Sequence, residues 1–202
     1  MPGPAMRYDN GHKRETRIRI LKTAADAVRA EGPERIGVAA VMRQAGMTHG
    51  GFYAHFDSKD ALVEASIAHM FDEAQARAEK HLDGRTPAEG LAAYVDTYLS
   101  PAHCEARALG CPLVALASDL PRQSEACRHA YATGMRRLVQ ALARRLAAGG
   151  YPDPEPLARS VLSELVGTVS LARCETDAQQ ANAMLADARR LLKARLGLEQ
   201  CQ

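Results

Sequence analysis

Hydrophobic residues recur along most of this chain at intervals of three and four, and runs that alternate at every second position are nearly absent. From Ile18 to Val28 this spacing predicts a helix over residues 13–31, which Gly32 and Pro33 end. The pattern therefore indicates an all-α protein rather than one built on a sheet.

Two much shorter elements follow this helix. Residues 38–45 form a predicted short helix that Gly46 stops, and Thr48 is placed to cap the next one with its hydroxyl. Phe52 and Phe56 stand four apart and are expected to point inward. Two short helices joined by a turn at a glycine are typical of a helix-turn-helix, whose second helix enters the major groove of DNA.

Longer helices are predicted in the rest of the chain, over residues 58–82, 86–99, 124–148, 155–173 and 177–196. Asp57 or Ser58 can cap the first of them, and Thr86 with Glu89 forms a capping box for the second. The helix over 155–173 is apolar on nearly every side, so it needs to be covered on both faces.

These elements predict about nine helices in two units, a helix-turn-helix head over residues 11–57 and a larger helical body over residues 58–202. The residues before about Gly11 are rich in proline and glycine, so we expect them to form a mobile polar arm. A short apolar segment, residues 111–120, interrupts the long helices of the body.

The chain has 202 residues and a net charge of only +2, but this charge is unevenly spread. Residues 7–59 hold ten Lys and Arg against six Asp and Glu, a surplus of +4, which leaves −2 for the remainder. A basic head on a slightly acidic body fits a unit that binds a polyanion such as double-stranded DNA.

The chain has five cysteines, an odd number with no Cys-x-x-Cys pair among them. Its first residues lack the apolar stretch of a signal peptide, and no apolar run reaches the length of a membrane span. We therefore expect a cytoplasmic protein with free thiols and no membrane partner.

Residue patterns that carry catalysis are absent from the sequence. It has no paired nucleophile and base, no glycine-rich phosphate loop and no cluster of metal ligands. His103 beside Cys104, and Cys127 near His129, have the wrong spacing for a complete metal site. We expect no enzyme activity, no cofactor and no bound metal.

The segment from Ala45 to Ala65, AGMTHGGFYAHFDSKDALVEA, is the most distinctive stretch of the chain. Together with Ile20-Leu21 and Ala24-Ala25 it resembles the tetracycline-repressor (TetR) family of transcriptional regulators. The resemblance implies an all-helical homodimer that pairs through its last two helices. It also implies a head that binds a palindromic operator and a body that holds a small-molecule effector. Most such regulators are repressors that release DNA when the effector binds, although activators look alike.

The resemblance also assigns a DNA-contacting surface, at Thr48, His49, Gly50, Gly51, Tyr53, His55, Lys59 and Arg17. His49 stands where the family often has Lys or Arg, and Gly37 stands where it usually has Thr or Ser to cap a helix and touch a phosphate. For Tyr53 and His55 the alternative is packing between helices, and for Lys59 it is a solvated lysine.

The effector is expected to lie among the central helices, with these candidate contacts: Tyr94, Tyr98, Cys111, Leu116, Tyr131, Met135 and Leu165. Plain core is the alternative for each of them. Cys111, in LGCPLVALASDL, resembles a segment of one branch of the family in which some members sense electrophiles or oxidants. That role requires a thiolate of lowered pKa, and Pro112 is consistent with a helix start that would help. A buried small hydrophobe is the alternative for Cys111, and an apolar or aromatic molecule is the alternative effector.

A second function class is compatible with the same pattern. A helical protein-interaction module, or an effector-binding protein without sequence-specific DNA binding, would also have long amphipathic helices. The dependence of DNA affinity on salt separates the two classes, because neutralised phosphates release counterions.

Overall fold

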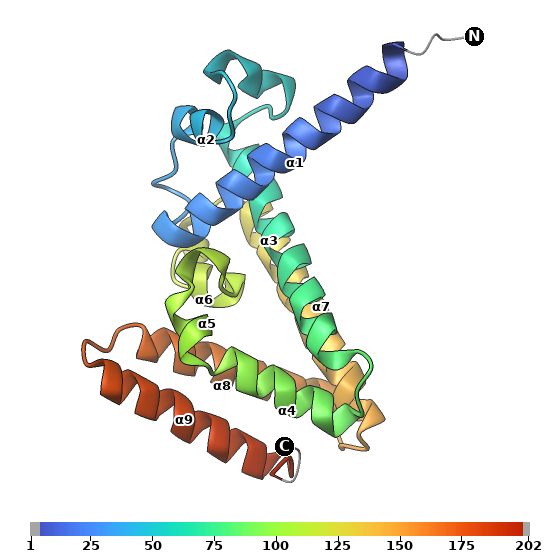
Figure 1. Ribbon diagram of the computed structural model, residues 1–202, viewed down its shortest axis with the longest axis vertical. Helices are drawn as coiled ribbons and strands as arrows, with labels where there is room; N and C mark the ends of the chain where they lie inside the picture. Colours follow the sequence, from blue (N-terminus) through green and yellow to red (C-terminus); the bar gives the residue numbers. More distant parts are fainter. Residues whose placement is uncertain (1–4, 200–202) are drawn as a thin grey trace.

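The computed structural model describes the backbone of residues 5–199 and the side chains of residues 11–199 (Figure 1). Over this range the chain forms nine α-helices: α1 (Ala5–Glu31), α2 (Val38–Gln44), α3 (Lys59–Leu82), α4 (Pro87–Tyr98), α5 (Pro101–Glu105), α6 (Pro112–Leu116), α7 (Glu125–Ala148), α8 (Pro154–Ala172) and α9 (Ala178–Arg195). Three short 3-10 helices lie between them: η1 (His49–Ala54), η2 (Arg107–Leu109) and η3 (Leu120–Arg122). The all-α fold of about nine helices is confirmed.

The head consists of α1, α2 and η1, which enclose a small apolar core (Figure 1). Ile20 of α1, Met42 of α2 and Phe52 of η1 are almost fully buried there. Gly46 adopts a φ of +74° directly after α2, a conformation that glycine takes without strain. The glycine therefore turns the chain between the two short helices, as the sequence predicted.

The start of the head differs from the prediction. The first helix begins at Ala5, so residues 5–10 continue α1 and do not form the expected arm, while residues 1–4 lie outside the described part. The expected hydroxyl cap at Thr48 is also wrong. The Gly51 amide donates to the Thr48 backbone carbonyl at 3.1 Å, because Gly50 and Gly51 disfavour an α-helix and the segment winds as a tighter 3-10 turn.

The caps of the body helices agree with the sequence. Ser58, and not Asp57, caps α3 by accepting a hydrogen bond from the Ala61 amide at 3.0 Å. The capping box of Thr86 and Glu89 is present at the start of α4. The short helices α5, η2 and η3 were not predicted, because they are too brief to show a hydrophobic period.

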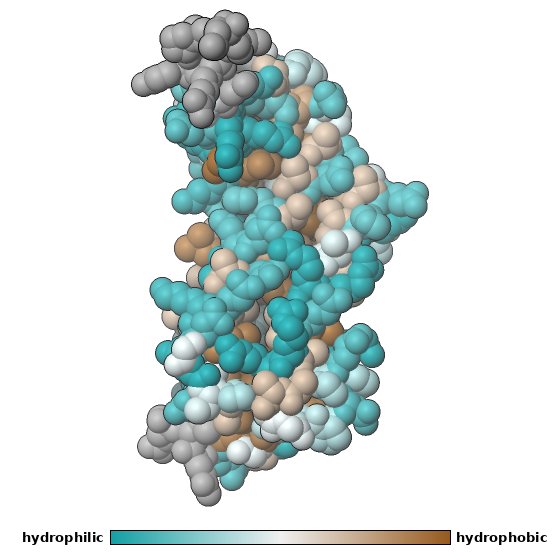
Figure 2. Space-filling view, turned by 90° about the vertical axis from the view of Figure 1, so that its right-hand side faces the viewer, coloured by the Kyte–Doolittle hydropathy of each residue, from teal (hydrophilic) through white to brown (hydrophobic). Residues whose placement is uncertain are grey.

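Helices α3 and α7 lie side by side along the length of the body, and α4, α8 and α9 cross its far end (Figure 1). Figure 2 shows a face of the molecule on which hydrophilic residues predominate and apolar ones are scattered in small groups. In the described part of the chain, no helix is long and apolar enough to cross a membrane.

The cores of head and body share two helices. Ala25 and Val28, near the end of α1, pack in the core of the body, whereas Leu62, near the start of α3, packs in the core of the head. The two units are therefore joined by continuous helices as well as by the loop between them.

Candidate functional site

The outward surface of η1 is polar and backed by a rigid apolar anchor. Phe52 and Phe56 are buried, with their rings stacked at 5.9 Å between centroids. Tyr53 points the other way, with 70% of its surface exposed. Thr48, His49 and Gly50 are exposed as well, and Gly51 is half-buried. The buried phenylalanines fix η1 on the head, and the exposed residues leave its other side free for a partner.

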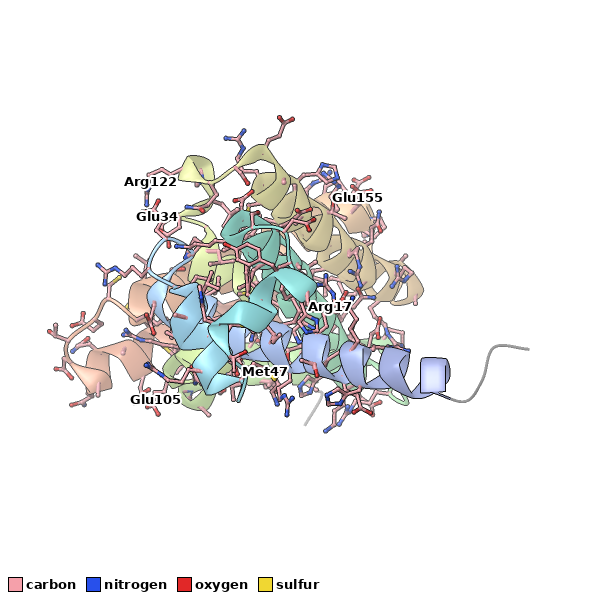
Figure 3. The ribbon with its side chains drawn as sticks, turned by 90° about the horizontal axis from the view of Figure 1, so that it is seen from above. Arg17, Glu34, Met47, Glu105, Arg122 and Glu155 are labelled. Carbon is pink, nitrogen blue, oxygen red and sulfur yellow. The ribbon has the colours of Figure 1, made fainter. Side chains whose placement is uncertain are left out.

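Arg17 of α1 holds the end of η1 in place (Figure 3). Its guanidinium donates a hydrogen bond to the carbonyl oxygen of His55 at 2.6 Å and lies 4.2 Å from the centre of the Phe56 ring. Half-buried His55 keeps its Nδ1 atom buried without a partner among the described residues. Burial, aided by the charges of Lys13 and Arg17, lowers the pKa of His55, so its imidazole carries no charge at neutral pH.

Lys59 occupies the first position of α3 and is exposed. Its Nζ atom donates a hydrogen bond to the Glu34 carbonyl oxygen at 2.8 Å, which leaves two of its donors available. Gly37 takes the cap position of α2 but offers no side-chain cap, as expected for a glycine. The predicted surface residues thus lie at one end of the head, although Arg17 and His55 face the protein.

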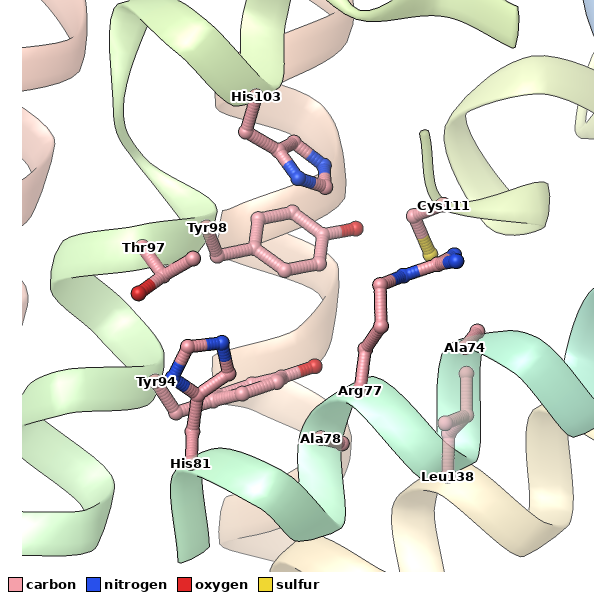
Figure 4. Close-up of a pocket in the computed structure, with 10 residues that line it drawn as sticks. All are labelled: Ala74, Arg77, Ala78, His81, Tyr94, Thr97, Tyr98, His103, Cys111 and Leu138. Atoms are coloured by element: carbon pink, nitrogen blue, oxygen red, sulfur yellow. The ribbon is translucent and has the colours of Figure 1, made fainter. Parts of the chain in front are cut away.

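A cavity opens in the body between α3, α4, α5 and α7, with an empty volume of about 440 Å3 that includes its opening to solvent (Figure 4). Its walls comprise Ala74, Arg77, Ala78, His81, Tyr94, Thr97, Tyr98, His103, Cys111 and Leu138. These walls combine apolar, aromatic and polar side chains, as the walls of small-molecule sites do.

The predicted effector contacts divide into three groups. Tyr94, Tyr98 and Cys111 line this cavity. Tyr131 and Met135 instead line a separate groove between α7 and α8. Leu116 and Leu165 are fully buried in the core and line neither space.

Four polar residues of the cavity were missed by sequence reasoning: Arg77, His81, Thr97 and His103. Arg77 and His81 are one turn apart on α3, so a polar stripe beside the apolar face of that helix was the available signal. His103 lies on the unpredicted helix α5, and nothing in the local pattern marked it.

Burial sets the protonation of the cavity walls. It raises the pKa of the Tyr94 and Tyr98 hydroxyls and lowers the pKa of His103 to about 4. Burial also lowers the pKa of His81. The tyrosines are therefore protonated donors at neutral pH, and both histidines are uncharged.

Cys111 is buried at the start of α6, and burial raises the pKa of its thiol. The nearby Tyr98 hydroxyl, the backbone at Leu113 and Val114 and the charge of Arg77 lower this pKa but do not reverse the shift. The lowered pKa that a reactive thiolate requires is therefore absent at Cys111.

Comparison with known proteins agrees with this geometry. Residues 20–66 match the model of bacterial regulatory proteins of the tetR family. Residues 87–188 match the C-terminal domain of LmrA/YxaF-like transcriptional regulators. None of the curated proteins matches the chain by sequence.

Solved structures share the fold at low sequence identity. The reduced form of Escherichia coli NemR is 21% identical with a TM-score of 0.78, covering 89% of this chain and 97% of that one. A TetR regulator from Chloroflexus aurantiacus is 21% identical with a TM-score of 0.79, covering 92% and 96%. A regulator from Saccharomonospora viridis, solved with choline, is 18% identical with a TM-score of 0.73, covering 89% and 96%.

A small helix-turn-helix head joined to a large helical body defines a transcriptional regulator. The two matched regions together span most of the chain, which belongs to the TetR family of transcriptional regulators. This family is regulatory rather than enzymatic, and its members bind DNA, dimerise and carry a C-terminal ligand-binding domain.

Proposed function

We propose that this chain binds a double-stranded DNA operator as a homodimer and represses transcription until a small molecule occupies the body. The observation that carries this proposal is the outward surface of η1. His49 and Tyr53 are exposed there, while Phe52 and Phe56 anchor the element from behind. A helix-turn-helix head reads base edges with a rigid element that exposes one polar side.

Each residue of this surface has a distinct proposed role. Thr48 and His49 approach base edges or phosphates, and Gly50 with Gly51 lets the backbone come close to the DNA. Tyr53 contacts a phosphate and sets the register of the head on the duplex. Lys59 contacts a phosphate from the start of α3 through the two donors that Glu34 leaves available.

Arg17 and His55 are proposed to act indirectly. The Arg17 guanidinium is engaged with the His55 carbonyl and the Phe56 ring, and the Nδ1 atom of His55 is buried. Both residues would then contribute by holding η1 at the angle that the groove requires.

Each unit has its own proposed function. The head, residues 11–57, binds DNA, and the body, residues 58–202, binds the effector and forms the dimer. We place the dimer contact on α8 and α9. Leu171 of α8 is 62% exposed and Leu191 of α9 is 55% exposed, so each helix has apolar surface left to cover. A second copy of the chain would supply the cover that the apolar character of α8 calls for.

The cavity beside Arg77, Tyr94 and Tyr98 is the proposed effector site. The neighbour from Saccharomonospora viridis, solved with choline, supports a small molecule as the kind of effector. A regulator of this type acts in the cytoplasm, where the DNA lies, and needs neither catalysis nor a cofactor.

The test begins with duplexes selected by the purified chain from a random pool. Their affinity is then measured by fluorescence anisotropy across a series of salt concentrations. We expect a near-palindromic site and a linear fall of log affinity with log salt. Lys59→Ala should weaken binding to all sequences alike and reduce the slope by about two for the dimer, because each lost phosphate contact removes about 0.9.

Lys80→Ala is the matched control, since Lys80 is also an exposed lysine of α3 but lies near the opposite end of the helix. It should leave both the affinity and the slope unchanged. A dimer that selects no duplex at low salt would favour the helical interaction module instead. A Lys59→Ala variant with altered sequence preference and undiminished affinity would refute the phosphate assignment.

A further inference from the structure

We infer that the cavity of the body is built for a small aromatic carboxylate, one ring bearing a single negative charge. The inference rests on the proposed function, because it names the chemical class of the effector. Its basis is the arrangement of Arg77, Tyr98 and His103 around one space that is open to solvent (Figure 4).

Arg77 gives the cavity its charge. Among the described residues that line it, Arg77 alone is charged at neutral pH, and no carboxylate lines the walls. Its exposed side chain stands at the opening, and Figure 4 shows the guanidinium directed toward Cys111 across the space. An anion entering the cavity therefore meets a cation at the opening.

Arg77 also lacks a partner among the described residues. It forms no hydrogen bond or ion pair with any residue that the structure describes. Arg29, which lies close enough to influence Arg77 electrostatically, is paired with both Asp26 and Glu73. The fold neutralises one of these two arginines and leaves the other available, so a ligand carboxylate can accept from its free donors.

Two buried polar groups of the cavity have no hydrogen-bond partner among the described residues. They are the Tyr98 hydroxyl and the Nε2 atom of His103. The hydroxyl is near the Cys111 thiol but makes no hydrogen bond of good geometry with it. Buried polar groups are rarely left unsatisfied, so these two positions indicate that an occupant with polar atoms completes the site.

A second arginine reinforces the positive potential. The guanidinium of Arg173 donates to the carbonyl oxygens of Cys104 at 2.9 Å and His103 at 3.4 Å, and it has no carboxylate partner in the described part of the chain. Its charge contributes to the low pKa of His103. Aromatic walls alone would suit a quaternary ammonium ion, but two arginines without a carboxylate partner among the described residues oppose a cation and favour an anion.

The aromatic walls of the cavity favour a flat ligand. The rings of Tyr94 and Tyr98 lie 5.8 Å apart between centroids, and the imidazole of His103 stacks on Tyr98 at 4.6 Å. Ala74, Ala78 and Leu138 complete the apolar part of the wall. These rings contact one another, so a ligand's aromatic ring would lie against the cluster, with its carboxylate turned toward Arg77 and the Tyr98 hydroxyl.

Isothermal titration calorimetry on the full chain tests this inference at neutral pH. Benzoate, phenylacetate and cinnamate are the anionic probes, benzamide is the neutral isostere and benzylamine is the cation. We expect at least one acid to bind, the amide to bind about tenfold more weakly or worse, and the amine not to bind. A lost charge-assisted hydrogen bond has about this effect.

Arg77→Met should weaken the bound acid about tenfold and leave the binding of benzamide unchanged. Tyr98→Phe should weaken the acid severalfold, which provides a second variant with a smaller perturbation. Arg144→Met replaces an exposed arginine of α7 that does not line the cavity, and it should bind every probe as the wild type does. Circular dichroism of each variant confirms that it is folded.

The inference fails if none of the three acids binds, if acid and amide bind equally, or if Arg77→Met leaves the acid's affinity unchanged. Anisotropy with the selected duplex, measured on the same preparations without a probe, separates this failure from failure of the proposed function. DNA binding without acid binding would overturn only the effector class. Acid binding without DNA binding would leave the cavity chemistry standing and overturn the regulator.

Discussion

Gly134 of α7 faces the ring of Phe71 of α3 with no room for a side chain between them. A Cβ atom built on Gly134 would lie 2.1 Å from Cγ of Phe71, far inside van der Waals contact. Both residues are buried, and the two helices are the longest in the body. The glycine is therefore what allows α3 and α7 to approach so closely at this point.

Gly134→Ala is expected to destabilise the protein by about 1–2 kcal/mol. Overpacking at so short a contact should cost about 2–3 kcal/mol, the upper part of the usual range, and the better helix propensity of alanine returns about 1 kcal/mol of it. Urea unfolding followed by circular dichroism measures the difference. Gly11→Ala is the control, because Gly11 also lies within a helix but has open space around it, and it should be neutral or slightly stabilising. Equal stability of Gly134→Ala and wild type would contradict the packing argument.

Leu171→Glu is expected to shift the chain from dimer to monomer. The side chain of Leu171 is 62% exposed on α8, and a charge placed in an apolar contact between copies would be buried without a partner. Sedimentation velocity at several concentrations measures the change. Leu109→Glu replaces an equally exposed leucine of η2 and should stay dimeric. A monomeric wild type would refute the proposed dimer, and a dimeric Leu171→Glu variant would show that the interface lies elsewhere.

Stability should fall on acidification because of His103. Its pKa is about 4 in the folded chain, against 6.5 for the free side chain, so between these values the unfolded state binds a proton that the folded state does not. The contribution is complete above about pH 6.5 and is lost as the pH falls toward 4, with a total of up to about 3 kcal/mol.

Urea unfolding at a series of pH values measures this loss. His103→Gln should be less sensitive over the same interval, whereas His129→Gln, an exposed position on α7, should keep the wild-type profile. Parallel profiles for wild type and His103→Gln would show that other groups account for the acid sensitivity.

Iodoacetamide is expected to label Cys174 far faster than Cys111. Cys174 is exposed after α8, while Cys111 is buried with a raised pKa and so presents little thiolate at neutral pH. Peptide mass spectrometry over a time course compares the two in a Cys201→Ser background. Rapid labelling of Cys111 in the folded chain would restore the thiol-sensing hypothesis that its burial now argues against.

The head was largely predictable because its signals are local. Gly46, the phenylalanine pair and the Ser58 cap each act within a few residues of the chain, and the structure confirms all three. The Thr48 cap failed because the neighbouring glycines changed the type of helix, a competition that a cap rule does not weigh.

The cavity was less predictable because its walls come from distant segments. Tyr94 and Tyr98 were foreseen as aromatic residues among the central helices, but Arg77 and His103 meet there only through tertiary packing. A five-residue helix such as α5 is too short to show a hydrophobic period, and its position depends on tertiary contacts such as the hydrogen bond from Arg173 to the Cys104 carbonyl.

Helix α1 packs in the cores of both the head and the body. Its middle residues hold Phe52 and Met42 in the head, and its final turns are locked into the body through the Arg29 guanidinium, which bonds to Glu73 and to the Ala108 carbonyl. Because a helix is stiff along its axis, a small tilt at the locked end sweeps the opposite end through a wider arc. The attachment of α1 to the body therefore helps to set the position of the head.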